Sequence, residues 1–81
     1  MTAAIVPFPM ANRRSLIIRQ ARHAAQLSPD AAEDHIRRQL KIQAQAMRRR
    51  GIDEVLISEE IDRLETSIRA LLLRAVSGVI R

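Results

Sequence analysis

Five cationic side chains gather on one side of the helix predicted over residues 29–50: Arg37, Arg38, Lys41, Arg48 and Arg49. At about 100° per residue, the first, third and fourth of these project within about 40° of one another, with the other two beside them. Clustered cations neutralise nucleic-acid phosphates or the acidic surface of a protein. The spacing therefore predicts a basic ridge for nucleic acid or an acidic partner, and the preceding helix adds Arg19 and Arg22 as further candidates.

The arginines 48–50 also have a structural interpretation, because Gly51 follows them directly. Cations in the last turn of a helix face the negative end of its macrodipole, which stabilises by about 0.3–1 kcal/mol each at an exposed site. A short turn would also bring them near Asp53 and Glu54, at the start of the next helix. Two interpretations of arginines 48–50 therefore remain open, a phosphate-binding cluster and a charged helix end.

Two specific modes of nucleic-acid recognition do not fit the residues. In a helix-turn-helix protein, the helix after Gly51 would read the DNA, but its first half is acidic. Single-stranded nucleic acid is held by aromatic stacking, and Phe8 is the one aromatic residue in the chain. Non-specific contact with a duplex by the basic ridge is the nucleic-acid function that remains.

The chain lacks the residue patterns of catalysis or metal binding. His23 and His35 fall on different predicted helices, without a second ligand four residues away, so we expect them to be isolated. The serines fit helix caps or exposed positions, and there is neither a cysteine nor a glycine-rich phosphate loop. We therefore expect no enzymatic activity, no catalytic residue, no metal and no cofactor.

Composition indicates a small all-α domain. The chain has 81 residues and is 47% hydrophobic, yet nearly all of these residues are Ala, Ile, Leu, Val and Met. A chain of this length buries only about 60% of the surface that its unfolded form exposes, so its core is marginal. Without cysteine there is no disulfide to supplement it, which leaves self-association as the remaining source of buried area.

Charge is distributed unevenly along the chain. The formal net charge is +5, with ten cations and three acids in residues 1–51 but four cations and six acids in residues 52–81. Such asymmetry is typical either of a basic nucleic-acid surface or of complementary helices that pack together.

Proline, glycine and capping residues divide the chain into an arm and three helices. Pro7 and Pro9 favour an extended arm over residues 1–11, which either covers the helices or binds another protein. One helical domain follows over residues 12–81, with helices over 12–26, 29–50 and 53–79. Asn12 and Ser28 are predicted to cap the first two helices, and Gly51 to end the second.

Each predicted helix has an apolar face. On the first helix this face comprises Leu16, Ile17, Ala21, Ala24 and Ala25; on the second, Ala32, Ile36, Leu40, Ala44 and Met47; on the third, Ile57, Ile61, Leu64, Ile68, Leu71 and Ala75. The spacings of three and four residues are those of packed helices. Because the turn at Gly51 is short, the second and third helices should form a long antiparallel hairpin, with the first helix packed on it.

The third helix carries more apolar surface than one neighbouring helix can cover. Its last turns add a second set of apolar residues, rotated away from the first: Leu72, Leu73, Val76, Val79 and Ile80. Soluble monomers seldom expose so large a contiguous patch. We expect this patch to mediate self-association as a homodimer.

Several short segments resemble those of one protein family. These are the arm Ile5-Val6-Pro7-Phe8-Pro9, the entry Asn12-Arg13-Arg14-Ser15, the corner Leu27-Ser28-Pro29-Asp30-Ala31-Ala32-Glu33 and the stop Met47-Arg48-Arg49-Arg50-Gly51-Ile52. Together they resemble a family of short alphaproteobacterial helical proteins that is a domain of unknown function. The resemblance implies a bacterial source and a cytoplasmic location, and it transfers no site residue.

The sequence as a whole favours a non-enzymatic protein–protein interaction module. We expect a regulator, adaptor or inhibitor that acts as a homodimer on an unidentified protein partner, in the cytoplasm. The alternative is a basic DNA-binding accessory protein that uses the ridge. No run approaches the ~18 apolar residues of a membrane span, and we expect no secretory signal, because prolines interrupt the apolar residues 3–10.

Overall fold

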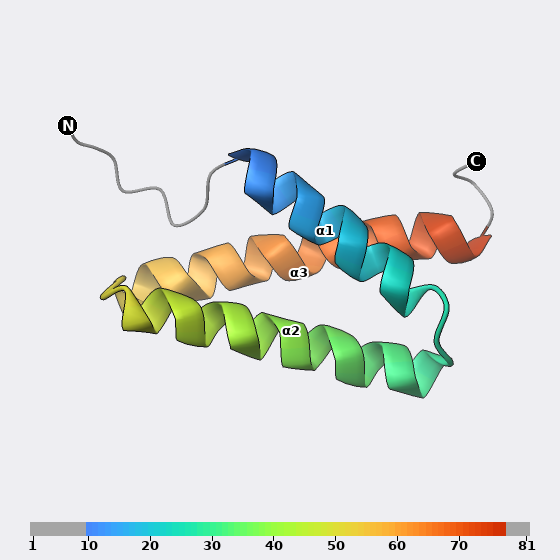
Figure 1. Cartoon of the computed structure of the whole chain (residues 1–81), viewed down its shortest axis with the longest axis horizontal. Coiled ribbons are helices and arrows are strands. Elements are labelled where there is room, and N and C mark those ends of the chain that lie inside the picture. Colours follow the sequence, from blue (N-terminus) through green and yellow to red (C-terminus); the bar gives the residue numbers. More distant parts are fainter. Residues whose placement is uncertain (1–9, 78–81) are drawn as a thin grey trace.

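Three helices form the computed structural model, which describes residues 10–77 (Figure 1). They are α1 (Met10–Ala24), α2 (Pro29–Arg49) and α3 (Glu54–Ser77). The described residues contain no strand, so the predicted all-α fold class is confirmed. The predicted arm lies almost entirely outside the described residues.

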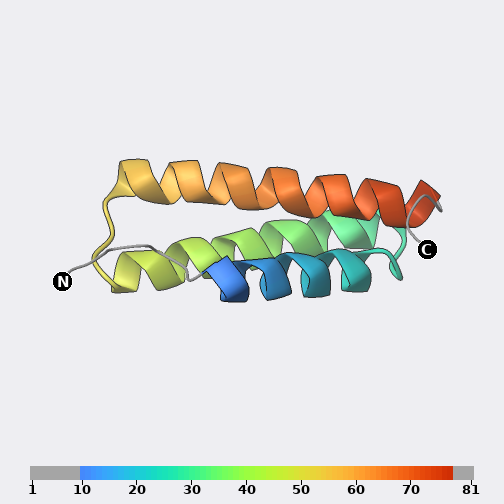
Figure 2. The ribbon, with the colours of Figure 1, turned by 90° about the horizontal axis from the view of Figure 1, so that it is seen from above.

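The helices pack as a flat three-helix bundle. α2 and α3 run in opposite directions from a short turn, and α1 crosses α3 and ends near the start of α2 (Figure 1). Viewed from above, α3 lies on one side and α1 and α2 lie on the other (Figure 2). α3 contacts both partners more extensively than they contact each other. The molecule measures 43 × 23 × 15 Å, so each helix keeps a long solvent-facing side.

The ends of α2 follow the predicted capping chemistry. Ser28 accepts a hydrogen bond from the backbone N–H of Ala31 at 3.3 Å and Pro29 occupies the first turn. At the other end Gly51 has φ +79°. The N–H of Gly51 donates to Arg48 O at 2.9 Å, and the N–H of Ile52 donates to Met47 O at 3.1 Å. These two bonds form a Schellman motif, which a left-handed glycine permits.

The bounds of α1 differ from the prediction. The helix begins at Met10 and not at Asn12, so residues 10 and 11 belong to the helix and not to the arm. Met and Ala are strong helix formers, so α1 can begin two residues before Asn12. It also ends earlier, at Ala24, because the N–H groups of Gln26 and Leu27 bond three residues back, to His23 O and Ala24 O.

The core lies where the three predicted apolar faces meet. Its buried hydrophobic residues are Leu16, Ala21, Ala24, Ala32, Ile36, Leu40, Met47, Ile57, Leu64 and Ile68. Among the large side chains, Ile36, Met47, Leu64 and Ile68 are the most fully buried. The alanines of α1 and α2 let the helix backbones approach closely. The core is therefore narrow, and its few large residues each contribute much of the burial.

The predicted apolar seam of α3 is buried over most of its length and becomes exposed near the end of the helix. Ile61 and Leu71 are half-buried against the core, whereas Ala75 is exposed. α3 begins at Glu54, and the carboxylate of Asp53 accepts a hydrogen bond from the N–H of Val55 at 3.0 Å. It is described as far as Ser77, and the predicted residues 78–79 lie outside the described part. Within residues 10–77, no helix has the length and hydrophobicity needed to cross a membrane.

Candidate interaction surfaces

The predicted self-association patch is divided by the fold. Leu72, a predicted member of the patch, is half-buried and packs against the core. Leu73 and Val76 are 67% and 60% exposed. Val79 and Ile80 lie outside the described residues. The part of the patch that faces solvent in the described chain is therefore the pair Leu73 and Val76.

A groove runs beside this pair. It has a volume of about 540 Å³ and lies between the corner that joins α1 to α2 and the last turns of α3. Leu27 and Ala32 line one side, and Leu72, Leu73 and Val76 line the other. Its size is within the range of about 300–1,000 Å³ that is typical of binding sites. An apolar surface and an adjacent groove thus occupy the same end of the bundle.

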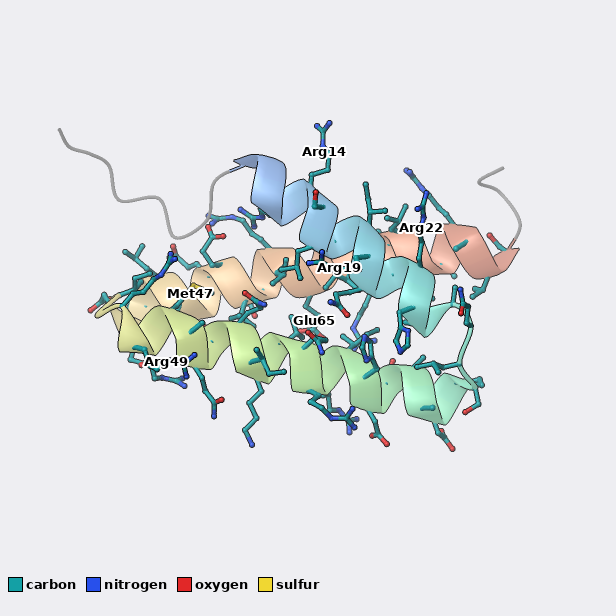
Figure 3. The ribbon with its side chains drawn as sticks, in the orientation of Figure 1. Arg14, Arg19, Arg22, Met47, Arg49 and Glu65 are labelled. Carbon is teal, nitrogen blue, oxygen red and sulfur yellow. The ribbon has the colours of Figure 1, made fainter. Side chains whose placement is uncertain are left out.

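The basic ridge lies on the solvent-facing side of α2. All five of its predicted members are exposed: Arg37, Arg38, Lys41, Arg48 and Arg49. Arg49 extends away from the bundle (Figure 3). Arg37 is 3.9 Å from Asp34, a distant and exposed pair. Arg38, Lys41 and Arg49 form no salt bridge with any described residue, so these cations are available to a partner.

Arg48 has a structural role at the turn. Its Nε donates to Glu54 Oε2 at 2.6 Å and its Nη2 donates to Glu54 Oε1 at 3.1 Å. This bidentate pair joins the end of α2 to the start of α3, as the helix-end interpretation predicted. The hydrogen bond raises the pKa of Arg48 and lowers the pKa of Glu54. The other two arginines of the run are also exposed.

Arg22 of α1 does not extend the ridge as one surface. Arg19 and Arg22 are exposed, as their predicted place opposite the apolar face requires. Arg14 and Arg22 point away from α2 (Figure 3). The exposed cations therefore cover two sides of the bundle.

The two histidines are adjacent, which corrects the expectation that they are isolated. The ring centroids of His23 and His35 lie 4.4 Å apart, because α1 docks on the first half of α2. His35 Nε2 lies 2.6 Å from Oε1 of Gln20, whose side chain is buried in the α1–α2 contact. Since an amide oxygen only accepts, His35 donates through Nε2. Burial, together with the nearby His23 and Arg38, lowers the pKa of His35.

Two clusters of ionic contacts hold the helices together, and sequence reasoning missed both. Arg69 of α3 donates to Glu33 of α2 at 2.5 and 3.0 Å and to Glu65 at 2.9 Å. These bonds raise the pKa of Arg69, and the bond from Arg69 lowers the pKa of Glu33. Glu65 lies between α2 and α3 (Figure 3).

The second cluster joins α1 to α3. Glu60, with a side chain only 13% exposed, lies 2.9 Å from both Arg13 and Arg63. Its Oε1 forms the ion pair with Arg13 without the alignment of a hydrogen bond. The available signal was that Glu60 and Arg69 stand directly beside the seam residues Ile61 and Ile68 in the sequence. Their partners, however, depend on how the helices rotate against each other. Within the described residues, no cluster of three His, Asp or Glu side chains could hold a metal ion.

Comparison with known families gives one match. A family model described as a family of unknown function (DUF6074) matches residues 1–79. The chain belongs to this family. Neither the comparison with curated proteins nor the comparison with solved structures found a match. Membership in DUF6074 assigns no activity, so function has to be argued from the surfaces of this chain.

This DUF6074 chain has one further exposed apolar surface. Among the described residues, the large hydrophobic side chains that are exposed are Ile42, Val55, Leu56, Leu73 and Val76. All of these except Ile42 belong to α3, at its two ends. The sequence predicted the exposed apolar residues at the C-terminal end of α3 but not Val55 and Leu56 at its N-terminal end. Their helical position was the signal that could have shown them, because Val55 lies on the side of α3 opposite the seam and Leu56 flanks that side.

Proposed function

We propose that this chain is a non-enzymatic protein–protein interaction module that acts as a homodimer, in the role of a regulator, adaptor or inhibitor. The observation that carries the proposal is the exposure of Leu73 and Val76 beside the groove at the end of α3. Full burial of such side chains contributes about 1.5–3 kcal/mol each. A two-fold dimer would cover this patch with a surface of the second copy and, by symmetry, the patch of the second copy with the same surface of the first.

Other features support an interaction role over catalysis. The carboxylates of Glu33, Glu54 and Glu60 each contact an arginine, so they serve to join helices. A bacterial, cytoplasmic setting is part of the proposal, and the absence of cysteine fits a reducing compartment.

Sedimentation of the purified protein tests the dimer. We expect the unmodified chain to sediment as a dimer at micromolar concentration and Leu73→Glu to sediment as a monomer, because the dimer would have to bury an unpaired carboxylate. Ile42→Glu is the matched control. Ile42 is also an exposed large hydrophobic residue, at 44%, but it lies on α2. A monomeric unmodified chain would refute the proposal, as would equal dissociation by both substitutions.

A second candidate function, non-specific binding of duplex nucleic acid, is favoured by the exposed ridge on α2. Arg38, Lys41 and Arg49 have no acidic partner among the described residues, and the ridge follows one side of a helix. Phosphate contacts by such cations are independent of base sequence and weaken steeply with salt.

The test of this candidate replaces Arg38, Lys41 and Arg49 together by glutamine. Binding to duplex DNA, measured by fluorescence anisotropy at 50 and 200 mM salt, should weaken and lose about one unit of salt slope per cation removed. Arg14, Arg19 and Arg22 changed to glutamine on α1 form the control with the same loss of charge. Equal losses from both sets would indicate attraction by net charge alone and would exclude the ridge as a site.

A further inference from the structure

A second stripe of exposed residues runs along α3, on the side opposite its buried seam: Val55, Glu59, Asp62, Thr66, Ala70, Leu73 and Ser77. They recur at intervals of three or four residues, which is the spacing of a helix-pairing seam. α1 and α2 both lie on the other side of α3 (Figure 2). We call this stripe the outer face of α3. Within the described part of the chain, no element covers it.

The outer face is apolar at both ends and small in the middle. Val55 and Leu73 are 65% and 67% exposed, and Leu56 and Val76 flank them. Between these ends Thr66 and Ala70 present short side chains, which allow another helix to approach closely. This pattern suits a partner helix that lies along the whole of α3, more than a ligand at one end.

The unpaired charges on and beside the outer face change sign along α3, from acidic in its first half to basic in its second half. Glu59 and Asp62 lie in the first half of α3, and Arg74 flanks the stripe in the second half. None of the three forms a salt bridge with a described residue. A parallel pair of such helices would place Glu59 against Glu59 and Arg74 against Arg74. An antiparallel pair places the acidic half of each helix against Arg74 of the other.

We propose that two copies of this chain pair their α3 helices antiparallel along the outer face, about a two-fold axis at Thr66. The proposal rests on the homodimer proposed above and specifies its geometry. With the axis at Thr66, Leu73 of each copy enters the hole formed on the other copy by Val55, Ser58, Glu59 and Asp62. Glu59 of each copy then lies beside Arg74 of the other, so one contact occurs twice by symmetry.

The groove between α1 and α3 is consistent with this arrangement. It has a volume of about 840 Å³, and Ala70 and Arg74 of α3 face Arg14 and Ile18 of α1 across it. The second copy's acidic half would lie along this edge. Arg14, which forms no salt bridge with a described residue, adds a second cation near the incoming Glu59. Charge therefore favours the acidic half of a second copy as the occupant.

Exchange of the two charges tests the pairing. In Glu59→Arg alone, both symmetric contacts become arginine against arginine, and in Arg74→Glu alone both become glutamate against glutamate. Each variant should dimerise at least about tenfold more weakly than the unmodified chain in sedimentation equilibrium. An equimolar mixture should form heterodimers with nearly the original affinity, because both contacts again join opposite charges. The double variant E59R/R74E should also recover.

The control for this exchange is Arg38→Glu, the same charge reversal on α2. Alone, it should dimerise like the unmodified chain. Mixed with Glu59→Arg, it should restore less affinity than Arg74→Glu does, because the heterodimer keeps one arginine–arginine contact and has only one contact of opposite charge. Circular dichroism of each variant establishes that the helices are intact. A dimer that Leu73→Glu disrupts but that charge exchange does not restore would overturn the antiparallel pairing and leave the proposed homodimer standing. A monomeric unmodified chain would overturn both.

Engineered cysteines give a second readout, because the chain has none of its own. In the antiparallel pair Glu59 and Leu73 of different copies are opposite each other, whereas the two Leu73 residues are about 20 Å apart. Under mild oxidation Leu73→Cys should not cross-link to itself but should cross-link to Glu59→Cys, since a disulfide requires Cα atoms within about 7 Å. Self-cross-linking of Leu73→Cys as efficient as the mixed reaction would indicate parallel helices and refute the proposal.

Discussion

At the scale of single residues, the contact between Gln20, His23 and His35 is the polar part of an otherwise apolar α1–α2 interface. The buried amide of Gln20 is satisfied by His35, which is needed because an unpaired buried amide would cost about 1–3 kcal/mol. Protonation of His35 keeps this bond, since Nε2 still donates, but it places a charge beside His23 and Arg38. The interface therefore favours the neutral imidazole.

This preference predicts a pH dependence of stability. The pKa of His35 is lower in the folded chain than its ordinary value of about 6.5. At pH values between the pKa of His35 in the folded chain and its ordinary value, the unfolded chain binds more protons than the folded chain. The free energy of unfolding therefore rises with pH in this range. We expect the melting temperature to fall as pH is lowered from 7.5 to 5, above the range in which Glu33 and Glu54 titrate.

NMR titration of the imidazole protons checks the assignment, and two histidines make the spectrum simple. His23→Gln should raise the pKa of His35, because it removes the electrostatic effect of His23 while sparing the bond to Gln20. His35→Gln should flatten the change in melting temperature between pH 7.5 and 5. If His35 titrates at 6.5 or above in the folded chain, the interface does not act in this way.

These residue contacts could not be predicted from the sequence. Helical periodicity placed Leu16 and Ile36 in the core, but it does not specify how far α1 turns about its axis against α2. A rotation of α1 by a few tens of degrees would separate His23 from His35. The same holds for Glu60, which finds Arg13 only through the packing of α1 on α3. Pairings between helices are properties of the assembled bundle.

At the scale of elements, the turn from α2 to α3 could be predicted from the sequence because each interaction that forms it is local. A left-handed glycine, a Schellman pair of hydrogen bonds and the Arg48–Glu54 contact all act within a few residues of Gly51. The start of α1 was less readable, since it has no comparable capping signal and Met10 extends it beyond the predicted Asn12.

The turn also yields a prediction for Gly51→Ala. A Cβ at this position meets nothing within 4 Å, so the substitution causes no steric clash. The cost comes from φ +79°, which disfavours an L-residue by about 1–2 kcal/mol. Chemical denaturation should show a loss of that size for alanine and a smaller loss for Gly51→Asn, because asparagine tolerates the left-handed region. Equal losses of stability in the two variants would mean that the left-handed φ is not the cause.

At the scale of the whole molecule, the chain combines a narrow core with an uncovered face. Four large side chains are fully buried, and several of the other core residues are alanines. The sequence predicted this shortage of buried area and the excess of apolar surface at the end of α3. It did not indicate that the face shared by Val55 and Leu73 stays uncovered, because that conclusion needs the position of α1 and α2 around α3.

The last prediction follows from that shortage. If folding and dimerisation are coupled, the folded state is stabilised by mass action, and its melting temperature depends on protein concentration. We expect the melting temperature of the unmodified chain to rise as the concentration is raised from 2 to 200 μM, a range chosen to span about two decades of mass action. Leu73→Glu should melt lower and at one temperature throughout, because its monomer gains nothing from a second copy. Ile42→Glu should keep the concentration dependence. A concentration-independent melting temperature for the unmodified chain would show that its own 81 residues suffice for the fold, and would remove the physical reason for the dimer.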